Sequence, residues 1–220
     1  MRFLPRLAAL ALIPAAALLP VSPLQAHPHA WIDMRTAMVF DEQGRVTALR
    51  VDWLFDEIYS LYSTEELDDD GDGRPDDERM HEFVAGAIDR LEEYGYFSVV
   101  KVDEQQAGYG SVTEFDGSLQ GDRLLMRFTL PLAEAVDPRT ASFSYAVYDP
   151  TFYIQILHQQ VDPIALEGAA PAGCRSDLRP PEPNEEMVAF AASLDQTQSG
   201  GDGLGAYFAE WVSLSCNAEG

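Results

Sequence analysis

The amino-acid sequence predicts an α+β fold, mainly antiparallel β and sandwich-like, with inserted helices and an EF-hand-like acidic loop. Three observations support this prediction. Segments in which apolar and polar residues alternate occur near the beginning, in the middle and at the end of the chain. Two segments with helical periodicity interrupt them. The order of these segments lacks the regular strand–helix alternation of a parallel α/β sheet, which makes the helices insertions into a β-framework.

Residues 30–40 and 46–55 are predicted to form a β-hairpin. Both segments are rich in strand-forming residues, and residues 42–45 between them are typical of a turn. Apolar residues occupy alternate positions of the second segment and give it one apolar face: Leu49, Val51, Trp53 and Phe55.

Helices and further strands are predicted for the rest of the chain. Residues 56–67 are expected to form a short helix, and residues 77–94 a longer one with an apolar stripe. Asn184 is expected to cap a third helix. Residues 161–183, rich in Pro and Gly, are expected to be irregular, and Asp116-Gly117 is expected to form a turn. The remaining predicted strands are 97–102, 111–115, 123–130, 143–148, 152–158 and 212–216.

Residues 1–26 are predicted to be a secretory signal peptide, which leaves residues 27–220 as a single periplasmic metal-binding domain. Arg2 and Arg6 precede an apolar stretch, and Ala26 ends a cleavage site. No other apolar run approaches the roughly 18 residues of a membrane-spanning helix. The chain has 37 acidic against 14 basic residues and a net charge of −23, so nucleic acid is not expected as a partner.

The N-terminal histidines are the first candidate site. Cleavage after Ala26 would free the amine of His27, which with its own imidazole forms a two-point chelate for a transition metal. On a strand, His29 and Asp33 share the face of His27. Pro28 has no amide hydrogen to lose, which excludes a square-planar site through the second backbone amide. These ligands accept Zn²⁺, Ni²⁺ and Co²⁺, with copper as an alternative.

Two distant histidines are candidates to complete this site. His158, at the end of an aromatic-rich segment, is included in the predicted metal site, and His81 flanks the apolar stripe of its helix. Each of these two is better explained as a surface histidine or as a core histidine with its hydrogen bonds satisfied. For His27 and His29 metal binding is the preferred interpretation, and a polar terminus behind a cleavage site is the alternative.

An acidic loop is the second candidate site. It reads D-x-D-x-D-G, the first half of an EF-hand loop, and Gly73 permits the sharp turn. Position twelve, normally a bidentate Glu, is Arg79, so we expect weak, structural calcium binding with a Kd of ~10⁻⁴–10⁻³ M. The alternative is a solvated run of charges. The predicted calcium ligands are Asp68, Asp70, Asp72, Arg74 through its carbonyl, and Asp76.

Cys174 and Cys216 are the only cysteines of the chain. In an exported protein they are expected to form a disulfide, since their spacing matches no zinc motif. The sequence contains no nucleophile elbow, zinc-protease motif or Gly-rich phosphate loop, so an enzyme is not expected. One enzyme class stays open: a copper-dependent oxidative enzyme in which the N-terminal amine and imidazoles hold copper. A calcium-stabilised interaction domain is the other alternative.

Several distinctive features follow one another along the chain. They are His-Pro-His-Ala-Trp-Ile-Asp at 27–33, Trp-Leu-Phe-Asp-Glu at 53–57, the acidic loop, Tyr-Gly-Tyr-Phe at 94–97, Tyr-Asp-Pro-Thr-Phe-Tyr at 148–153 and the cysteine pair. In these features the chain resembles a family of uncharacterised periplasmic proteins, described as the periplasmic component of an uncharacterised ABC-type transport system and associated with nickel/cobalt-exporter-type transporters. The resemblance covers the whole chain after the signal peptide, and it implies a periplasmic accessory that binds a divalent metal and has a membrane metal transporter as its partner.

Overall fold

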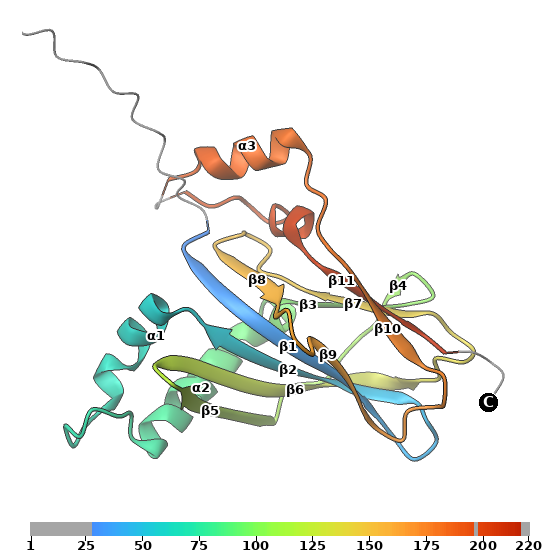
Figure 1. Ribbon diagram of the computed structural model, residues 1–220, viewed down its shortest axis with the longest axis horizontal. Helices are drawn as coiled ribbons and strands as arrows, with labels where there is room; N and C mark the ends of the chain where they lie inside the picture. The colour runs from blue at the N-terminus through green and yellow to red at the C-terminus, as the bar shows by residue number, and fades with distance from the viewer. Residues whose placement is uncertain (1–27, 196–197, 217–220) are drawn as a thin grey trace, which may run out of the picture.

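Two β-sheets pack face to face in the computed structural model of the chain, which describes residues 28–195 and 198–216 (Figure 1). The predicted signal peptide and His27 lie outside the described residues. The first sheet has the order β5-β6-β2-β1-β8, with β9 also paired to β1, and the second has the order β10-β11-β7-β3-β4. The predicted α+β, sandwich-like fold is confirmed.

The elements follow one another along the chain without a βαβ repeat. The first sheet contains β1 (Ala30–Phe40), β2 (Val46–Phe55), β5 (Glu114–Gln120), β6 (Arg123–Val136), β8 (Ile154–His158) and β9 (Ile164–Gly168). The second contains β3 (Ser98–Val102), β4 (Gln105–Gln106), β7 (Phe143–Val147), β10 (Arg175–Arg179) and β11 (Trp211–Ser215). The helices are α1 (Glu57–Thr64), η1 (Glu65–Leu67), α2 (Asp77–Glu92), η2 (Gly95–Phe97), α3 (Glu185–Ser193) and η3 (Gly205–Phe208).

The N-terminal hairpin forms with the predicted bounds, and its antiparallel register pairs Met34 with Trp53. Core-facing side chains of β1 are buried, whereas Trp31 and Asp33 on the other face are exposed. β8 and β9 run parallel to β1 and pair with its first and second halves in turn. These two short strands are the parallel exception in an otherwise antiparallel sheet.

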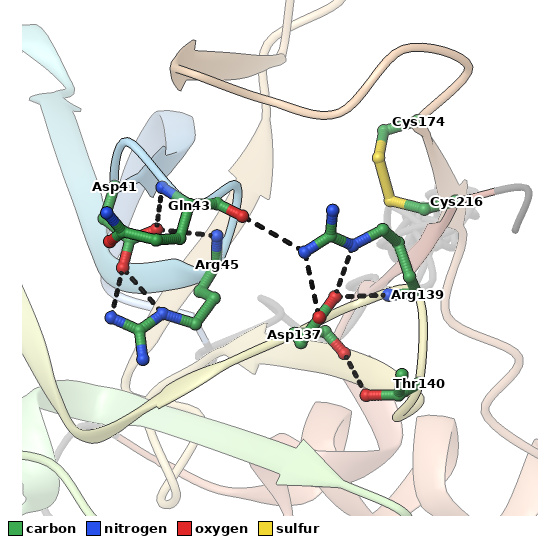
Figure 2. Close-up of polar contacts among 8 residues, drawn as sticks. All are labelled: Asp41, Gln43, Arg45, Asp137, Arg139, Thr140, Cys174 and Cys216. Carbon is green, nitrogen blue, oxygen red and sulfur yellow. Dashed lines mark hydrogen bonds and ion pairs between the residues drawn. A yellow bond between two sulfur atoms is a disulfide. The ribbon is translucent and has the colours of Figure 1, made fainter. Parts of the chain in front are cut away.

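The turn of this hairpin is fixed by charged side chains (Figure 2). The Asp41 carboxylate accepts hydrogen bonds from the backbone N–H groups of Gln43 and Arg45, at 3.0 and 2.9 Å. The Arg45 N–H chiefly accounts for a pKa of Asp41 below its ordinary value. The Arg139 guanidinium donates to the Gln43 carbonyl at 3.1 Å and likewise lowers the pKa of Asp137. The loop after β6 is thereby tied to the β1–β2 turn.

α2 packs on the core face of the first sheet at its β5 edge, and α3 lies beyond the opposite, β8 edge (Figure 1). Met80, Val84 and Ile88 form the buried stripe of α2. The predicted turn at Asp116-Gly117 is wrong, because both residues lie inside β5. A Cβ on Gly117 would lie 2.5 Å from Val84 Cγ2, so this glycine serves close helix–sheet packing.

Residues 161–183, expected to be irregular, contain β9 and β10. Their backbones pair with β1 and β11, partners that are distant in the sequence. The predicted disulfide between Cys174 and Cys216 is confirmed; it joins the residue before β10 to the residue after β11 (Figure 2). No helix among the described residues is long and apolar enough to cross a membrane.

Candidate metal-binding sites

His29 lies immediately before β1, where the chain enters the first sheet. Its backbone N–H donates to the Tyr153 carbonyl at 2.8 Å, and its ring lies against the Tyr153 ring with centroids 4.6 Å apart. Tyr153 belongs to the loop before β8, which Asp149 organises by accepting hydrogen bonds from Thr151 and Ile154. The imidazole is therefore held at the start of the sheet, next to the position of His27 in the sequence.

Asp33 shares the outward face of β1 with Trp31, as the strand periodicity predicts. It stands four residues beyond His29, which in a strand corresponds to about 13 Å. Its carboxylate lies 2.8 Å from the guanidinium of Arg123, which also donates to the carbonyls of Leu54 and Phe55. The structure does not bring Asp33 and His29 together, and it gives Asp33 a role in joining β1, β2 and β6.

His158 lies on the opposite, core-facing side of the first sheet, where it pairs in register with Met34. Its side chain is 1% exposed. Nδ1 lies 2.9 Å from the Glu210 carboxylate, and Nε2 lies 3.1 Å from Thr36 Oγ1, which in turn lies 2.6 Å from the Tyr145 hydroxyl. Both ring nitrogens are thus engaged, and the structure does not bring His158 to the His29 face of the sheet.

His81, the other distant candidate, is exposed on α2 and stacks on Phe115 with ring centroids 5.1 Å apart. It lies on the helix that covers the β5 edge, whereas β1 is separated from that edge by β2 and β6. The two distant histidines therefore occupy separate places in the fold, and neither joins His29.

The acidic loop does bring its carboxylates together. Ligand atoms of Asp68, Asp70 and Asp72 all lie within 4.8 Å of one another, the only such group of three His, Cys, Asp or Glu side chains among the described residues. The Asp68 carboxylate accepts hydrogen bonds from three backbone N–H groups of the loop, including that of Gly73 at 2.9 Å. Gly73 has a φ of +88°, the left-handed conformation expected at the sharp turn.

The rest of the loop is ordered in the same way. Asp72 Oδ1 accepts from the Arg74 N–H at 2.9 Å, and Asp76 Oδ2 accepts from the Asp69 N–H at 2.7 Å. Asp76 is also the N-cap residue of α2, so the loop leads directly into the helix. Arg79, at position twelve, pairs with Asp69 and Glu82. The donor set suits a hard cation with oxygen ligands, and the missing twelfth carboxylate limits its affinity.

Three residues that contact the predicted site residues were not predicted from the sequence: Tyr153 against His29, Arg123 with Asp33, and Glu210 with His158. Tyr153 belongs to one of the segments that carry the family resemblance, so its loop could have been suspected. Arg123 and Glu210 lie 90 and 52 residues from their partners Asp33 and His158. Only the packing of the whole chain brings such pairs together.

The fold and site define a class: a disulfide-bonded β-sandwich with inserted helices and an acidic loop in which three aspartates converge. The disulfide fits an extracytoplasmic protein. The chain belongs to the DUF1007 family, described as a protein family of unknown function, whose profile matches residues 12–216. It is also 26% identical over 200 residues to an uncharacterised protein of Haemophilus influenzae, which covers 87% of this chain and 91% of the relative.

Proposed function

We propose that the chain is a periplasmic accessory protein that binds a divalent transition metal, Zn²⁺, Ni²⁺ or Co²⁺, and works with a membrane metal transporter. In this proposal the acidic loop holds a structural Ca²⁺. The observation that carries the cation-binding part is the convergence of three aspartates within 4.8 Å in a loop ordered by its own backbone N–H groups. The periplasmic location is supported by the disulfide and by the signal-like residues 1–26.

The transition-metal contact belongs to the N-terminal end of the first sheet. After cleavage behind Ala26, the amine and imidazole of His27 would stand two residues from the His29 imidazole. The ring contact with Tyr153 and the backbone hydrogen bond limit the positions that His29 can take. One positioned imidazole beside a terminal chelate supplies three nitrogen donors, which suit all three candidate metals.

Isothermal titration of the processed protein with Zn²⁺, Ni²⁺ and Co²⁺ tests this contact. We expect binding of one ion, with an affinity reduced at least about tenfold by His29→Ala, since even the loss of a residue that only orients a metal ligand typically costs about that much. His81→Ala, an exposed histidine on α2, is the matched control and should leave the affinity unchanged. Equal binding by the wild type and by a His27→Ala, His29→Ala double variant would falsify the proposal. Intact-mass measurement of the exported protein checks the cleavage site.

The calcium part has its own test. Ca²⁺ is expected to raise the melting temperature of the wild type at millimolar concentration, in keeping with a Kd of ~10⁻⁴–10⁻³ M. Asp70→Asn and Asp72→Asn should abolish the increase. Asp69→Asn in the same loop is the control, since position two supplies no ligand. An increase that survives Asp70→Asn and Asp72→Asn would show that the loop is only a solvated acidic run.

Arg79→Glu supplies the carboxylate that an EF-hand loop has at position twelve. We expect it to tighten calcium binding to ~10⁻⁶–10⁻⁵ M, the range of complete sensor loops. Arg79→Gln separates this gain from the mere loss of a positive charge and should give a much smaller improvement. Calorimetry with Ca²⁺ measures all three proteins. An affinity of Arg79→Glu no higher than that of Arg79→Gln would contradict the assignment of the loop register.

A calcium-stabilised interaction domain is the second candidate, favoured by the exposed face of α1. Ile58, Leu61 and Tyr62 lie at helical spacing and are 69%, 64% and 71% exposed. Contiguous apolar side chains of this kind are typical of interaction surfaces. This function predicts that Ca²⁺ raises the stability of the protein. It also predicts that substitutions of His27 and His29 leave the transition-metal titrations unchanged.

A further inference from the structure

A cavity of about 300 Å³ lies between the core face of the first sheet and the helices that cover it. β2 contributes Trp53 and Phe55 to its wall, α1 contributes Tyr59, and α2 contributes Phe83 and Leu91. Phe97 lines it where η2 ends. Aromatic residues thus make up half of the wall, and ring–ring contacts favour a ligand that is itself aromatic.

One polar group in this wall is buried without a partner. Trp53 is 2% exposed, and its indole N–H has no hydrogen-bond partner among the described residues. Burying such a donor unpaired is unfavourable, and buried indoles normally find an acceptor. The nitrogen itself has almost no accessible surface, so a ligand packed against the Trp53 ring would perturb the indole N–H without bonding to it directly.

A positive charge also lines the cavity. Arg90, in the last turn of α2, is exposed and forms no ion pair with any residue in 28–195 or 198–216. Several other described arginines also lack an ion pair, and Arg90 is the one among them that lines this cavity. Arginine binds carboxylates, sulfonates and related anions with paired N–H donors.

We propose that this cavity binds a small aromatic monoanion, with the ring system among the aromatic side chains and the anionic group at Arg90. The volume indicates the size, because a cavity of about 150 Å³ holds benzene and one of about 300 Å³ accommodates a larger group of several aromatic rings. The cavity lies on the core face of the sheet, whereas Trp31 and Asp33 point to the other face. Neither His29 nor Tyr153 lines the cavity, so the site is distinct from the proposed metal contact.

A matched pair of fluorescent probes tests the charge requirement. 8-Anilinonaphthalene-1-sulfonate carries a sulfonate, and N-phenyl-1-naphthylamine has the same ring system without it. We expect Arg90→Gln to lower the affinity for the sulfonate probe about tenfold, as for one lost contact of opposite charges near a surface. The affinity for the neutral probe should stay within about twofold of that of the wild type. Arg35→Gln, on the outward face of β1, is the control for net charge and should change neither. The proposal would be overturned if Arg90→Gln lowered the affinities for both probes equally, or if it changed neither affinity.

A second variant locates the probes. Ala87 lines the cavity, and the larger side chain of Ala87→Leu should fill it. We expect the affinities for both probes to fall about tenfold or more while the circular dichroism spectrum stays native. Leu61→Ser removes an exposed apolar side chain outside the cavity and should leave both affinities unchanged. Binding that survives Ala87→Leu in a folded protein, or that is lost with Leu61→Ser, would place the probes elsewhere and refute the site. Should Ala87→Leu not fold, Arg90→Gln with the probe pair decides alone.

The indole N–H gives a direct readout on the wild-type protein. Addition of the sulfonate probe should shift the Trp53 indole resonance in a ¹H–¹⁵N spectrum, with Trp53→Phe used to assign that resonance among the three tryptophans. A resonance that does not move at saturating probe contradicts a ligand in contact with this wall.

Discussion

At the scale of single residues, His158 shows how burial decides the role of a histidine. Its ring connects Glu210 to Thr36, and Thr36 connects onward to Tyr145 of the second sheet. The chain of hydrogen bonds therefore links the two layers of the sandwich through the buried His158, Thr36 and Tyr145, with the partly exposed Glu210 at its end. A buried network of this kind stabilises the fold only while every member keeps its partner.

His158→Ala should lower the free energy of unfolding by about 2–4 kcal/mol, because it removes two side-chain hydrogen bonds of a buried ring and leaves a cavity between Glu210 and Thr36. Urea unfolding measures the loss. His81→Ala, on the surface of α2, should stay within about 0.5 kcal/mol of the wild type. Loss of transition-metal affinity in His158→Ala, with stability unchanged, would instead restore His158 to the metal site.

Tyr145 makes stability depend on alkaline pH. Burial raises the pKa of its hydroxyl far above the ordinary value of 10.0. The unfolded chain loses this proton above about pH 10 while the folded chain keeps it, so stability is fully present below that pH and falls as the pH rises further. In Tyr145→Phe the stability should decline less steeply between about pH 10 and 11.5. The variant should also have about 1 kcal/mol less unfolding free energy at pH 7, because it lacks the hydrogen bond to Thr36. A slope identical to that of the wild type in pH-dependent melting curves would contradict this account.

At the scale of elements, the contact between α2 and β5 depends on a missing side chain. Gly117 stands in the middle of β5, where Val84 and Met80 of α2 occupy the space that a Cβ would need. The helix can approach the sheet closely only at a glycine. The same contact places α2 above the end of the sheet where the aromatic cavity lies.

Gly117→Ala should destabilise the protein by about 1–3 kcal/mol through overpacking. Val84→Ala makes room, so we expect the double variant to be more stable than the sum of the two single effects predicts, by about 1 kcal/mol. Ser118→Ala, the next residue in β5, is the control for a change in the same strand. Strict additivity in chemical unfolding would show that the two side chains do not collide.

The elements with local patterns were predictable. The hairpin 30–55 and the apolar stripe of α2 follow from periodicities within a few residues, and both formed as predicted. β9 and β10 were not predicted, because their own residues show no strand pattern. They are strands because their backbones pair with β1 and β11. In the candidate sites, the aspartates of one loop were found in place, whereas Arg123 as the partner of Asp33 could not be foreseen.

At the scale of the whole molecule, the disulfide closes the second sheet at the β10–β11 edge. Cys174 and Cys216 are 42 residues apart, and the loop between them contains α3 and η3. α3 packs with Phe152, Leu204 and Phe208 into a small cluster of its own beside the β8 end of the first sheet. We expect this cluster to depend on the covalent link more than the main core does, because few apolar side chains hold it.

A Cys174→Ser, Cys216→Ser double variant should lose about 4 kcal/mol of unfolding free energy, the loop-closure entropy of a 42-residue loop. Denaturant unfolding checks the value, and the wild type under reducing conditions should show the same loss. Proteolysis is expected to cut first between residues 180 and 210 once the bond is absent. Unchanged stability of the double variant would mean that packing alone closes this loop.

The sequence by itself determined the hairpin, the helix that follows the acidic loop, the alternation of its aspartates and the cysteine pairing. Each depends on residues close in the chain or on a single pair. Only the tertiary structure decided which histidine faces the core, which arginine holds Asp33 and where an aromatic cavity lies. Thr36 and His158 are 122 residues apart, and no local pattern reports such a contact. It exists because β8 pairs with β1 and the second sheet covers both, which is a property of the packed chain as a whole.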